Sequence, residues 1–225
     1  MLRICHLFPE LTALYGDRGN VIVFEKRCLW RGIPYLTDAV RLGDEVDFSQ
    51  YQMVFIGGGS HGDLNRVVSR LMKERENLRA SIDGGLVVLA IGSGFQLLGE
   101  YCLDSDGKKL SCLDILDCYT AIGEKRRVGP STMEIQLDGQ PCQVVGFTNH
   151  TGETFLRGVS PWGQVVKGAG NNSEEQGEGA RYKNVFCSYF HGPLLPNNPK
   201  VADHLIKLAL ANAGHTYELH PLDDD

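Results

Sequence analysis

Short apolar runs, each closed by a turn-forming residue, recur along this chain and constrain its fold more than any other feature. They lie at Leu2–Phe8, Met53–Ile56, Leu86–Ile91, Gln143–Phe147 and Val185–Phe190. Apolar runs of this kind, bounded by Gly, Asp, Asn or Pro, are typical of buried strands. The sequence therefore predicts a buried strand at each of these positions.

Segments with helical spacing lie between several of these runs. Apolar residues recur among charged ones in Asn20–Trp30, Asp63–Arg79 and Pro199–Ala213, as expected for helices with one buried face. Strands that alternate with helices imply an α/β fold whose sheet is mostly parallel and covered on both faces. Ligands bind such sheets at the carboxyl ends of the strands, so chemistry is expected in the loops that begin there.

Other segments do not follow this alternation. We predict strands and loops at one edge of the sheet for Lys108–Asp138, a polar and glycine-rich surface loop for Asn171–Arg181, and a frayed end at Asp223–Asp225. A chain of 225 residues normally forms one domain. We expect that domain to span residues 1–215, followed by a polar tail over residues 216–225.

Charge and hydropathy exclude several classes of function. A net charge of -6 argues against a nucleic-acid partner, because phosphate backbones are bound by clustered Lys and Arg. The amino-terminal apolar run turns polar at Pro9, and no later run approaches the roughly 20 residues of a membrane span. We expect a soluble, cytoplasmic protein.

The seven cysteines are an odd number and are scattered, which favours reduced thiols in the core over disulfides. Cys112 and Cys118 lie six residues apart, but there is no second pair and no histidine at ligand spacing. A zinc site is therefore less favoured than plain core packing, and we predict no metal site.

The stretch Gly84–Gly99 predicts a buried strand, a tight glycine turn and then a helix. This is the layout of a nucleophile elbow, in which a strained turn projects one side chain over the sheet. An ordinary glycine-rich turn between a strand and a helix has the same spacing. On spacing alone the ordinary turn is the favoured interpretation.

A second candidate lies near the other end of the chain. The predicted strand over Asn184–Phe190 places His191 at its carboxyl end. An imidazole there can act as general base to a nucleophile on a neighbouring strand, because histidine exchanges its proton near neutral pH. The alternative is a histidine that caps or packs the strand end.

The third candidate is the triple glycine Gly57–Gly59, which follows the strand that ends at Ile56. Residues without side chains expose backbone N–H groups, which can bind an anion or stabilise an oxyanion. A phosphate loop is the rival interpretation, but the Walker spacing and its Lys-Ser/Thr pair are missing.

Together these three segments resemble the class I glutamine amidotransferases of the cobyric acid synthase-like branch. Finer matches resemble the GatD-type subunits of lipid II isoglutaminyl synthases, and they lie at Leu14–Asn20, Gly146–Gly152, Gly170–Asn172, Glu178–Asn184 and His191–Pro196. The resemblance spans nearly the whole chain. It implies a three-layer, flavodoxin-like α/β fold, with helices on both faces of a mostly parallel sheet.

The resemblance also implies a reaction and a partner. Such a subunit hydrolyses glutamine and passes the ammonia to a MurT-like Mur ligase, which uses ATP to amidate the D-glutamate of the lipid II stem peptide during cell-wall synthesis. ATP and Mg²⁺ are then expected on the ligase, and no cofactor is expected in this chain. The acceptor would be lipid-linked.

Site residues follow from the resemblance by position. Gly92 stands where the family has its nucleophilic cysteine, and His191 stands where the family has the histidine that activates it. Oxyanion stabilisation would come from the N–H groups of Gly58, Gly59 and Ser93.

Substrate binding is implied for Arg126, Gln96 and Asn149. A guanidinium suits the carboxylate of glutamine because it donates parallel hydrogen bonds. Without the family pattern, Arg126 would be interpreted as a solvated surface charge.

The chain departs from the family at its centre, because Gly92 has no side chain with which to attack. Thiolate catalysis cannot occur at this position. Ser93 lies one residue late, and the pattern G-x-S-x-G would need glycine where Ile91 and Phe95 stand. Ser93 is therefore a weak substitute.

The identity of the third member of a catalytic triad is also not fixed by the sequence. Pro193 occupies the place of the acid in the usual His-x-Glu pattern, and the partner ligase is one source of that acid. Asp17 is a candidate for orienting His191, although a cap or turn role at the start of the following helix is equally consistent with its position.

Competing hypotheses of function remain at this point. The first is a glutaminase subunit in which the missing nucleophile is artificial or compensated. The second is a catalytically silent amidotransferase-fold subunit that scaffolds or regulates the ligase, supported by the glycine at the elbow, which relieves strain of about 1–3 kcal/mol. A cobyrinate-type amidotransferase is weaker, because that enzyme normally carries a fused ATP-binding domain.

Overall fold

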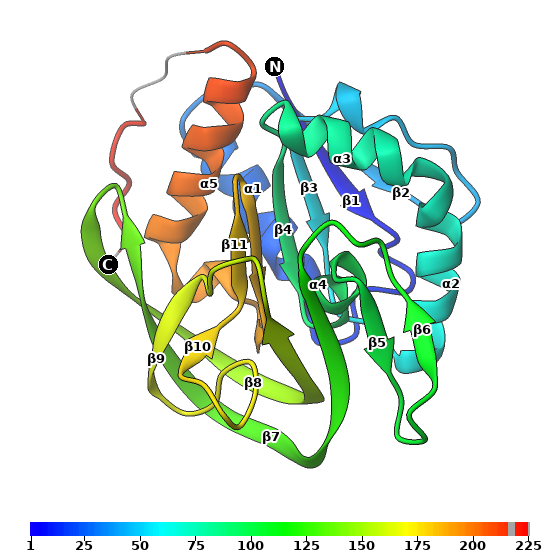
Figure 1. Cartoon of the computed structure of the whole chain (residues 1–225). Coiled ribbons are helices and arrows are strands. Elements are labelled where there is room, and N and C mark those ends of the chain that lie inside the picture. Colours follow the sequence, from blue (N-terminus) through cyan, green and yellow to red (C-terminus); the bar gives the residue numbers. More distant parts are fainter. Residues whose placement is uncertain (216–218, 225) are drawn as a thin grey trace.

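The computed structural model, which describes residues 1–215 and 219–224, contains the expected mostly parallel sheet (Figure 1). Its strands run in the order β11-β12-β4-β3-β1-β2. All neighbours in this order pair in parallel except β11 and β12, which are antiparallel. The bounds are β1 Leu2–Leu7, β2 Tyr35–Val40, β3 Met53–Ile56, β4 Val87–Ile91, β11 Ala180–Tyr182 and β12 Val185–Ser188.

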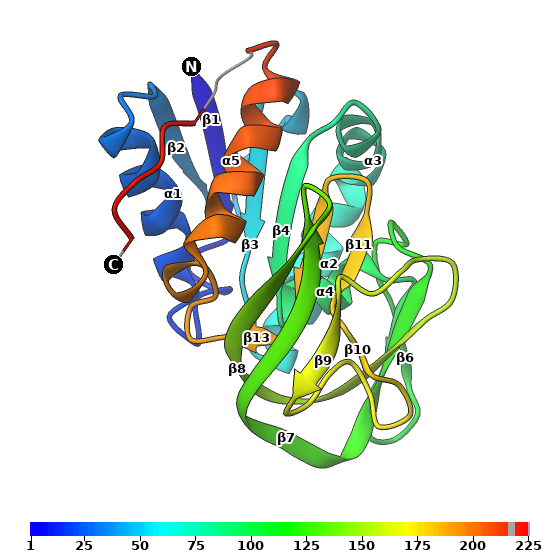
Figure 2. The same cartoon turned by 90° about the vertical axis from the view of Figure 1, so that its left-hand side faces the viewer.

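Helices cover both faces of this sheet, as predicted (Figure 2). Along β3, Met53 and Phe55 pack with the helices of one face, whereas Val54 and Ile56 pack with those of the other. This alternation follows from the two-residue period of a strand, and it requires apolar residues at every position of a central strand. One face carries α1 (Arg18–Trp30) and α5 (Pro199–Asn212), and the other carries α2 (His61–Leu71), α3 (Arg75–Asp83) and α4 (Ser93–Leu98).

A second, mostly antiparallel sheet lies at the end of the molecule to which the strands of the first sheet point (Figures 1 and 2). Its centre is the long pairing of β7 with β8. Its strands are β5 Tyr101–Leu103, β6 Lys109–Ser111, β7 Cys118–Leu137, β8 Gln140–Leu156, β9 Gly163–Lys167, β10 Gly177–Glu178 and β13 Phe190–His191. The prediction of strands and loops for Lys108–Asp138 is confirmed by β6 and β7, but their expected place at an edge of the parallel sheet was wrong, because both strands belong to the second sheet.

Two of the predicted strands differ in detail. The run at Gln143–Phe147 is part of β8 and is not buried throughout, since Val144 is buried while Val145 and Phe147 are exposed. The run at Val185–Phe190 ends at Ser188, and the chain then crosses to the second sheet, where β13 pairs with β8. His191 therefore lies in the second sheet, directly beyond the carboxyl end of β12.

The helix predictions hold with changed boundaries. The segment predicted as one helix at Asp63–Arg79 forms α2 and α3, separated by the short 3-10 turn Met72–Glu74. The side chain of Ser60 caps α2 by accepting a hydrogen bond from the N–H of Asp63 at 3.2 Å. The strand β2 was not predicted, because Asp38 interrupts its apolar run and its residues are mostly half-buried.

The segment Asn171–Arg181 is a surface loop only over residues 173–176, which are exposed, whereas most of the residues on either side are buried and include β10 and the start of β11. The side-chain amide of Asn171 accepts from the N–H of Gly179 and donates to its carbonyl, both at 2.7 Å. A buried peptide group is thereby satisfied as it would be in a sheet. Asn171 and Glu178 are fully buried as a result.

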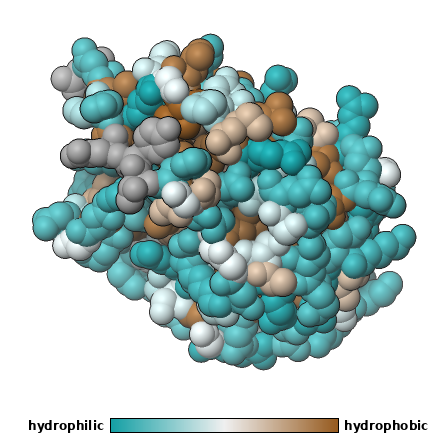
Figure 3. All heavy atoms as spheres, turned by 90° about the horizontal axis from the view of Figure 1, so that it is seen from above, coloured by the Kyte–Doolittle hydropathy of each residue, from teal (hydrophilic) through white to brown (hydrophobic). Residues whose placement is uncertain are grey.

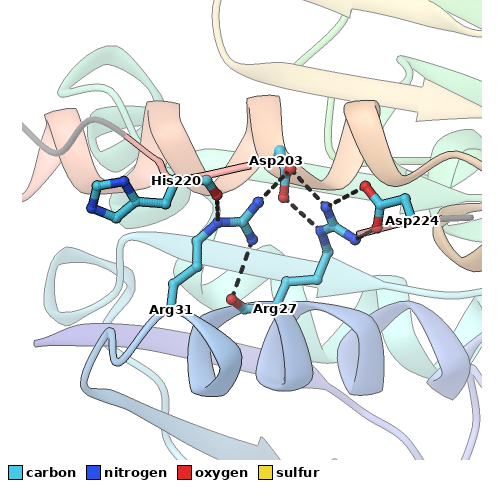
Figure 4. A network of polar contacts seen from close by, with 5 residues as sticks. All are labelled: Arg27, Arg31, Asp203, His220 and Asp224. Carbon is cyan, nitrogen blue, oxygen red and sulfur yellow. Dashed lines mark hydrogen bonds and ion pairs between the residues drawn. The ribbon is translucent and has the colours of Figure 1, made fainter. Parts of the chain in front are cut away.

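The carboxyl-terminal tail crosses α1 and α5 and is held by ion pairs (Figure 4). Arg27 of α1 and Arg31, the residue that follows α1, both bind Asp203 of α5 at 2.6 Å, and Arg27 also binds Asp224 of the tail at 2.6 Å. We call these four residues the α1–α5 clasp. The prediction of a frayed end was wrong for Asp224, and Asp225 lies outside the described residues.

The face at the amino ends of the parallel strands, seen in Figure 3, is mainly hydrophilic with scattered apolar residues. Within residues 1–215 and 219–224, no helix is long and apolar enough to cross a membrane. The same residues contain no group of His, Cys, Asp or Glu side chains that could hold a metal ion.

Candidate active site

The strand β4 ends at Ile91, and α4 begins at Ser93, so the turn consists of Gly92. Its backbone has φ +59° and ψ −119°, a conformation that strains any residue with a side chain. The N–H of Gly92 donates to the carbonyl of Ser188 at 2.9 Å, which ties the turn to the end of β12. The elbow geometry is thus present without a nucleophile.

His191 lies directly over this turn. A Cβ atom placed on Gly92 would come within 2.7 Å of Cε1 and 2.9 Å of Nε2 of His191. A side chain at position 92 would therefore meet the imidazole, and the ring would have to shift to admit it.

Asp17 supports His191 from the other side. Oδ1 of Asp17 lies 3.3 Å from Nδ1 of His191, and both side chains are buried. Tyr15 packs on the same imidazole with ring centroids 4.5 Å apart. The side chain of Asp17 does not cap α1, so the orienting role fits the geometry and the capping alternative does not. An acid on Nδ1 and a free Nε2 is the arrangement of an oriented general base.

Two of the three predicted oxyanion donors, the N–H groups of Gly58 and Gly59, already have partners. The N–H of Gly58 donates to Oδ2 of Asp17 at 2.8 Å, and the N–H of Gly59 donates to Oγ of Ser93 at 2.7 Å. These bonds stabilise the loop in its present form, and both would have to break before Gly58 or Gly59 could stabilise an oxyanion.

Ser93 shows no sign of an activated nucleophile. Its hydroxyl is engaged with the backbone of Gly59, and no hydrogen bond of the described residues joins it to His191. The cysteines offer no substitute, because within the described part of the chain none of them lines the cavity at the elbow. All except Cys142 are buried, and burial raises the pKa values of the Cys28 and Cys118 thiols to about 12.

A cavity of about 350 Å³ opens above the elbow, between the two sheets. It brings together all the predicted site residues except Asp17, which lies behind His191. Its lining comes from both sheets and from the loop after β1, and consists of Leu14, Tyr15, Gly58, Gly59, Ser60, Gly92, Ser93, Gln96, Ile122, Arg126, Asn149, His150, Thr151, Gly152, Tyr189 and His191.

Arg126 and Asn149 meet on one wall of this cavity. Nε of Arg126 donates to Oδ1 of Asn149 at 2.8 Å, across the irregular stretch of the β7–β8 pairing. No other hydrogen bond of Arg126 occurs among the described residues, which leaves the outer N–H groups of its guanidinium available to a carboxylate.

Gln96 belongs to a buried hydroxyl network beneath the cavity. Its Nε2 donates to the hydroxyl of Tyr189 at 3.2 Å, and that hydroxyl lies 2.6 Å from Oγ1 of Thr154. Thr154 in turn lies 2.7 Å from Oγ1 of Thr120 on the neighbouring strand. The amide of Gln96 is held in one orientation by this network.

Sequence reasoning missed several lining residues, above all Tyr15, His150 and Tyr189. Tyr15 and His150 lie in segments that carried the resemblance, at Leu14–Asn20 and Gly146–Gly152. Their position beside Asp17 and Asn149 was the signal that could have identified them. A larger cavity of about 720 Å³ lies away from the elbow, between the end of the β7–β8 hairpin, α5 and the tail.

Comparison with known proteins identifies the family of this chain. The CobB/CobQ-like glutamine amidotransferase domain family matches residues 3–199. The chain is 39% identical over 211 residues, 93% of its length and 80% of the relative, to the lipid II isoglutaminyl synthase (glutamine-hydrolyzing) subunit GatD of Streptococcus pneumoniae. It is 34% identical over 224 residues to the subunit of that name from Staphylococcus aureus, covering 100% of this chain and 90% of the relative.

A solved structure gives the same fold. The structure of PurLQS from Thermotoga maritima contains a chain that superposes on this one with a TM-score of 0.64 at 17% sequence identity. The superposition covers 94% of this chain and 99% of the other.

Proposed function

The chain belongs to the CobB/CobQ-like glutamine amidotransferase family, and from that premise we propose that it is a GatD-like subunit of a lipid II isoglutaminyl synthase. Its similarity to two GatD subunits extends over most of both chains. In this proposal it works in the cytoplasm with a MurT-like ligase, which binds ATP and Mg²⁺ and amidates D-glutamate of the lipid-linked stem peptide. This chain contributes the glutamine site.

The observation that carries the proposal is the direction of His191. Its Nδ1 faces Asp17, and its Nε2 faces the position that a side chain at residue 92 would occupy. This direction supports a site that acts on a group at residue 92, although glycine stands there.

With a cysteine at residue 92, the chemistry follows from this arrangement. His191 would remove the thiol proton, and the thiolate would attack the carboxamide carbon of glutamine while Asp17 stabilises the imidazolium. The proton on His191 would then pass to the departing ammonia, and water would release glutamate from the thioester. With Gly92 no sulfur–carbon bond can form, so this chain is expected to bind glutamine without hydrolysing it.

A second candidate is a silent subunit that scaffolds or regulates the ligase. It is favoured by the contact of His191 with Gly92 and by the occupied N–H groups of Gly58 and Gly59. In that case the glutamine site as a whole has lost its catalytic purpose.

The test is ammonia release from glutamine by the protein as it stands and by Gly92→Cys, each alone and with the ligase. Activity only in the cysteine form supports a glutaminase subunit that has lost its nucleophile. No activity in either form favours the silent subunit. Activity of the unaltered chain would contradict both and direct attention to Ser93.

A further inference from the structure

His150 of β8 lines the elbow cavity and has no role in the chemistry described above. Its side chain is only 7% exposed, and its ring stacks on Tyr189 with centroids 3.9 Å apart and an interplanar angle of 10°. The ring is therefore held in one plane, and the hydroxyl network beneath the cavity holds Tyr189 in turn.

The hydrogen bonds of His150 define its tautomer. Nδ1 lies 2.7 Å from the carbonyl oxygen of Gly152, and since a carbonyl can only accept, Nδ1 carries the proton. Burial is the main reason that the pKa of His150 falls to about 4, and the neighbouring Arg127 and His191 act in the same direction. The ring is neutral at physiological pH, so Nε2 carries a lone pair and no proton.

This Nε2 is buried and has no hydrogen-bond partner among the described residues. Folded proteins rarely leave such an atom unpaired, because its lost contact with water is not replaced. His6 also has an unpaired Nε2, but it does not line the cavity. His150 differs because it is one of the residues that line the cavity.

Glutamine has the matching groups. Its carboxylate needs donors, which Arg126 offers, whereas its ammonium and its carboxamide NH₂ need acceptors. The guanidinium of Arg126 cannot accept a hydrogen bond. Gln96, whose Nε2 donates to Tyr189, can offer its Oε1 to one of the two nitrogen groups. The other nitrogen group needs a second acceptor, and the lone pair on Nε2 of His150 matches that need.

We propose that His150 is a glutamine-binding residue whose Nε2 accepts a hydrogen bond from an N–H group of the substrate, either its ammonium or its carboxamide. This inference rests on the proposed function, since it assumes that glutamine occupies the elbow cavity. In this arrangement His150 recognises a nitrogen group of the ligand, whereas Arg126 recognises its carboxylate.

The test is calorimetric titration of the full chain with L-glutamine, which Gly92 allows at equilibrium because no turnover consumes the ligand. His150→Asn keeps an N–H near the position of Nδ1 but removes the acceptor, whereas His150→Gln places an amide oxygen near the position of Nε2. We expect about a tenfold rise in Kd for the asparagine variant and substantial recovery for the glutamine variant. His6→Asn is the matched control and should leave Kd unchanged.

Two analogues identify the donor. L-Glutamate lacks the carboxamide NH₂, and 4-carbamoylbutanoate lacks the ammonium. If His150→Asn weakens glutamine and 4-carbamoylbutanoate but not glutamate, the carboxamide is the donor. The ammonium is the donor if glutamine and glutamate are weakened and 4-carbamoylbutanoate is not.

An unchanged Kd in His150→Asn, or an equal loss for all three ligands with no recovery in His150→Gln, overturns the inference and leaves the proposed function standing. If the unaltered chain binds no glutamine, the proposed glutamine site fails and the inference fails with it.

Discussion

Polar groups are treated in opposite ways in two regions of the molecule, the elbow cavity and the α1–α5 clasp. In the clasp, Arg27 and Arg31 have side chains only 4% and 3% exposed, and both are paired with Asp203. In the cavity, Nε2 of His150 is buried and has no hydrogen-bond partner within residues 1–215 and 219–224, and the side chain of Arg126 has only the bond to Asn149 within the same residues. Burial alone therefore does not distinguish a structural polar group from a functional one.

The difference lies in whether the protein itself satisfies the group. A buried charge that is paired inside the chain stabilises one arrangement of the backbone, and removing its partner leaves an uncompensated charge. A polar atom left unpaired beside a cavity can be satisfied by a group from outside the chain. Substitutions in the clasp should therefore change stability, and substitutions in the cavity should change binding or reaction.

The largest effect is expected at Asp17, once chemistry has been restored. In the Gly92→Cys background, Asp17→Asn should lower the rate of ammonia release on the order of 10²–10⁴-fold, because His191 loses the carboxylate that orients it. The asparagine oxygen can still accept from the N–H of Gly58, so the loop is preserved. Steady-state assays of ammonia release measure this rate, and an unchanged circular dichroism spectrum shows that the variant is folded. A rate within a factor of about three of that of Gly92→Cys alone, roughly the context dependence of such effects, would show that Asp17 has no role in the mechanism.

The clasp should respond next. Asp203→Asn removes the carboxylate shared by Arg27 and Arg31 and should lower the free energy of unfolding by about 3 kcal/mol. The Kd for glutamine should not change, because the clasp lies away from the cavity. Urea denaturation and calorimetric titration measure the two quantities. A loss of glutamine binding in a folded Asp203→Asn protein would show that the clasp and the elbow cavity are not independent.

Arg126 should show the reverse pattern. Arg126→Ala should raise the Kd for glutamine by about 10–100-fold, the range expected when a hydrogen-bonded charge is lost. Its effect on unfolding should stay within about 0.5 kcal/mol, since the side chain is exposed. Lys125→Ala, at the exposed neighbouring position, is the control for general charge. An equal loss of glutamine affinity in both variants would show that the effect comes from the general positive charge of this surface and not from a contact between Arg126 and the carboxylate.

A pH-dependent effect is expected at Glu178, a buried acid that accepts hydrogen bonds from the N–H of Tyr189 at 2.6 Å and from the hydroxyl of Ser188. Burial raises its pKa from 4.5 to about 8, so the folded protein keeps a proton that the unfolded chain has released. Stability should therefore fall as pH rises between about 4.5 and 8, by at most about 1.4 kcal/mol per pH unit.

Glu178→Gln imitates the protonated acid and should flatten this slope, which denaturation curves across that pH range can measure. The difference between variant and parent should be smallest near pH 4.5 and largest near pH 8. A parallel pH dependence in the two proteins would show that Glu178 does not titrate in this way.

Much of the parallel sheet could be predicted, because its central strands are buried on both faces and are therefore apolar throughout. β3 matches its predicted bounds for this reason. β2 was missed because an edge strand tolerates Asp38, and β7 was misplaced because a half-exposed strand carries charges on its outer face. The segment Asn171–Arg181 was misassigned for another reason. Polar side chains that hydrogen-bond buried backbone groups give a segment the same composition as a loop.

The predicted site residues came from a resemblance more than from patterns. The structure gathers Gly92, Ser93, Gln96, Arg126, Asn149 and His191 around one cavity, while their roles remain predictions. His150 could not be identified, because a histidine inside a strand has the same sequence pattern whether it packs or binds. The distinction depends on the partner of each ring nitrogen, and that partner is set by tertiary structure.

The positive φ of Gly92 makes the change to glycine at this turn easier than the reverse change. Replacing a strained residue there with glycine relieves the strain, and the imidazole of His191 lies within 2.7 Å of where a Cβ atom at this position would stand. The reverse step must restore backbone strain of about 1–3 kcal/mol and also displace that ring. In a lineage that once carried glycine at this turn, the change back to a nucleophile would therefore cost more free energy than the change to glycine. This holds even with every other catalytic residue still in place.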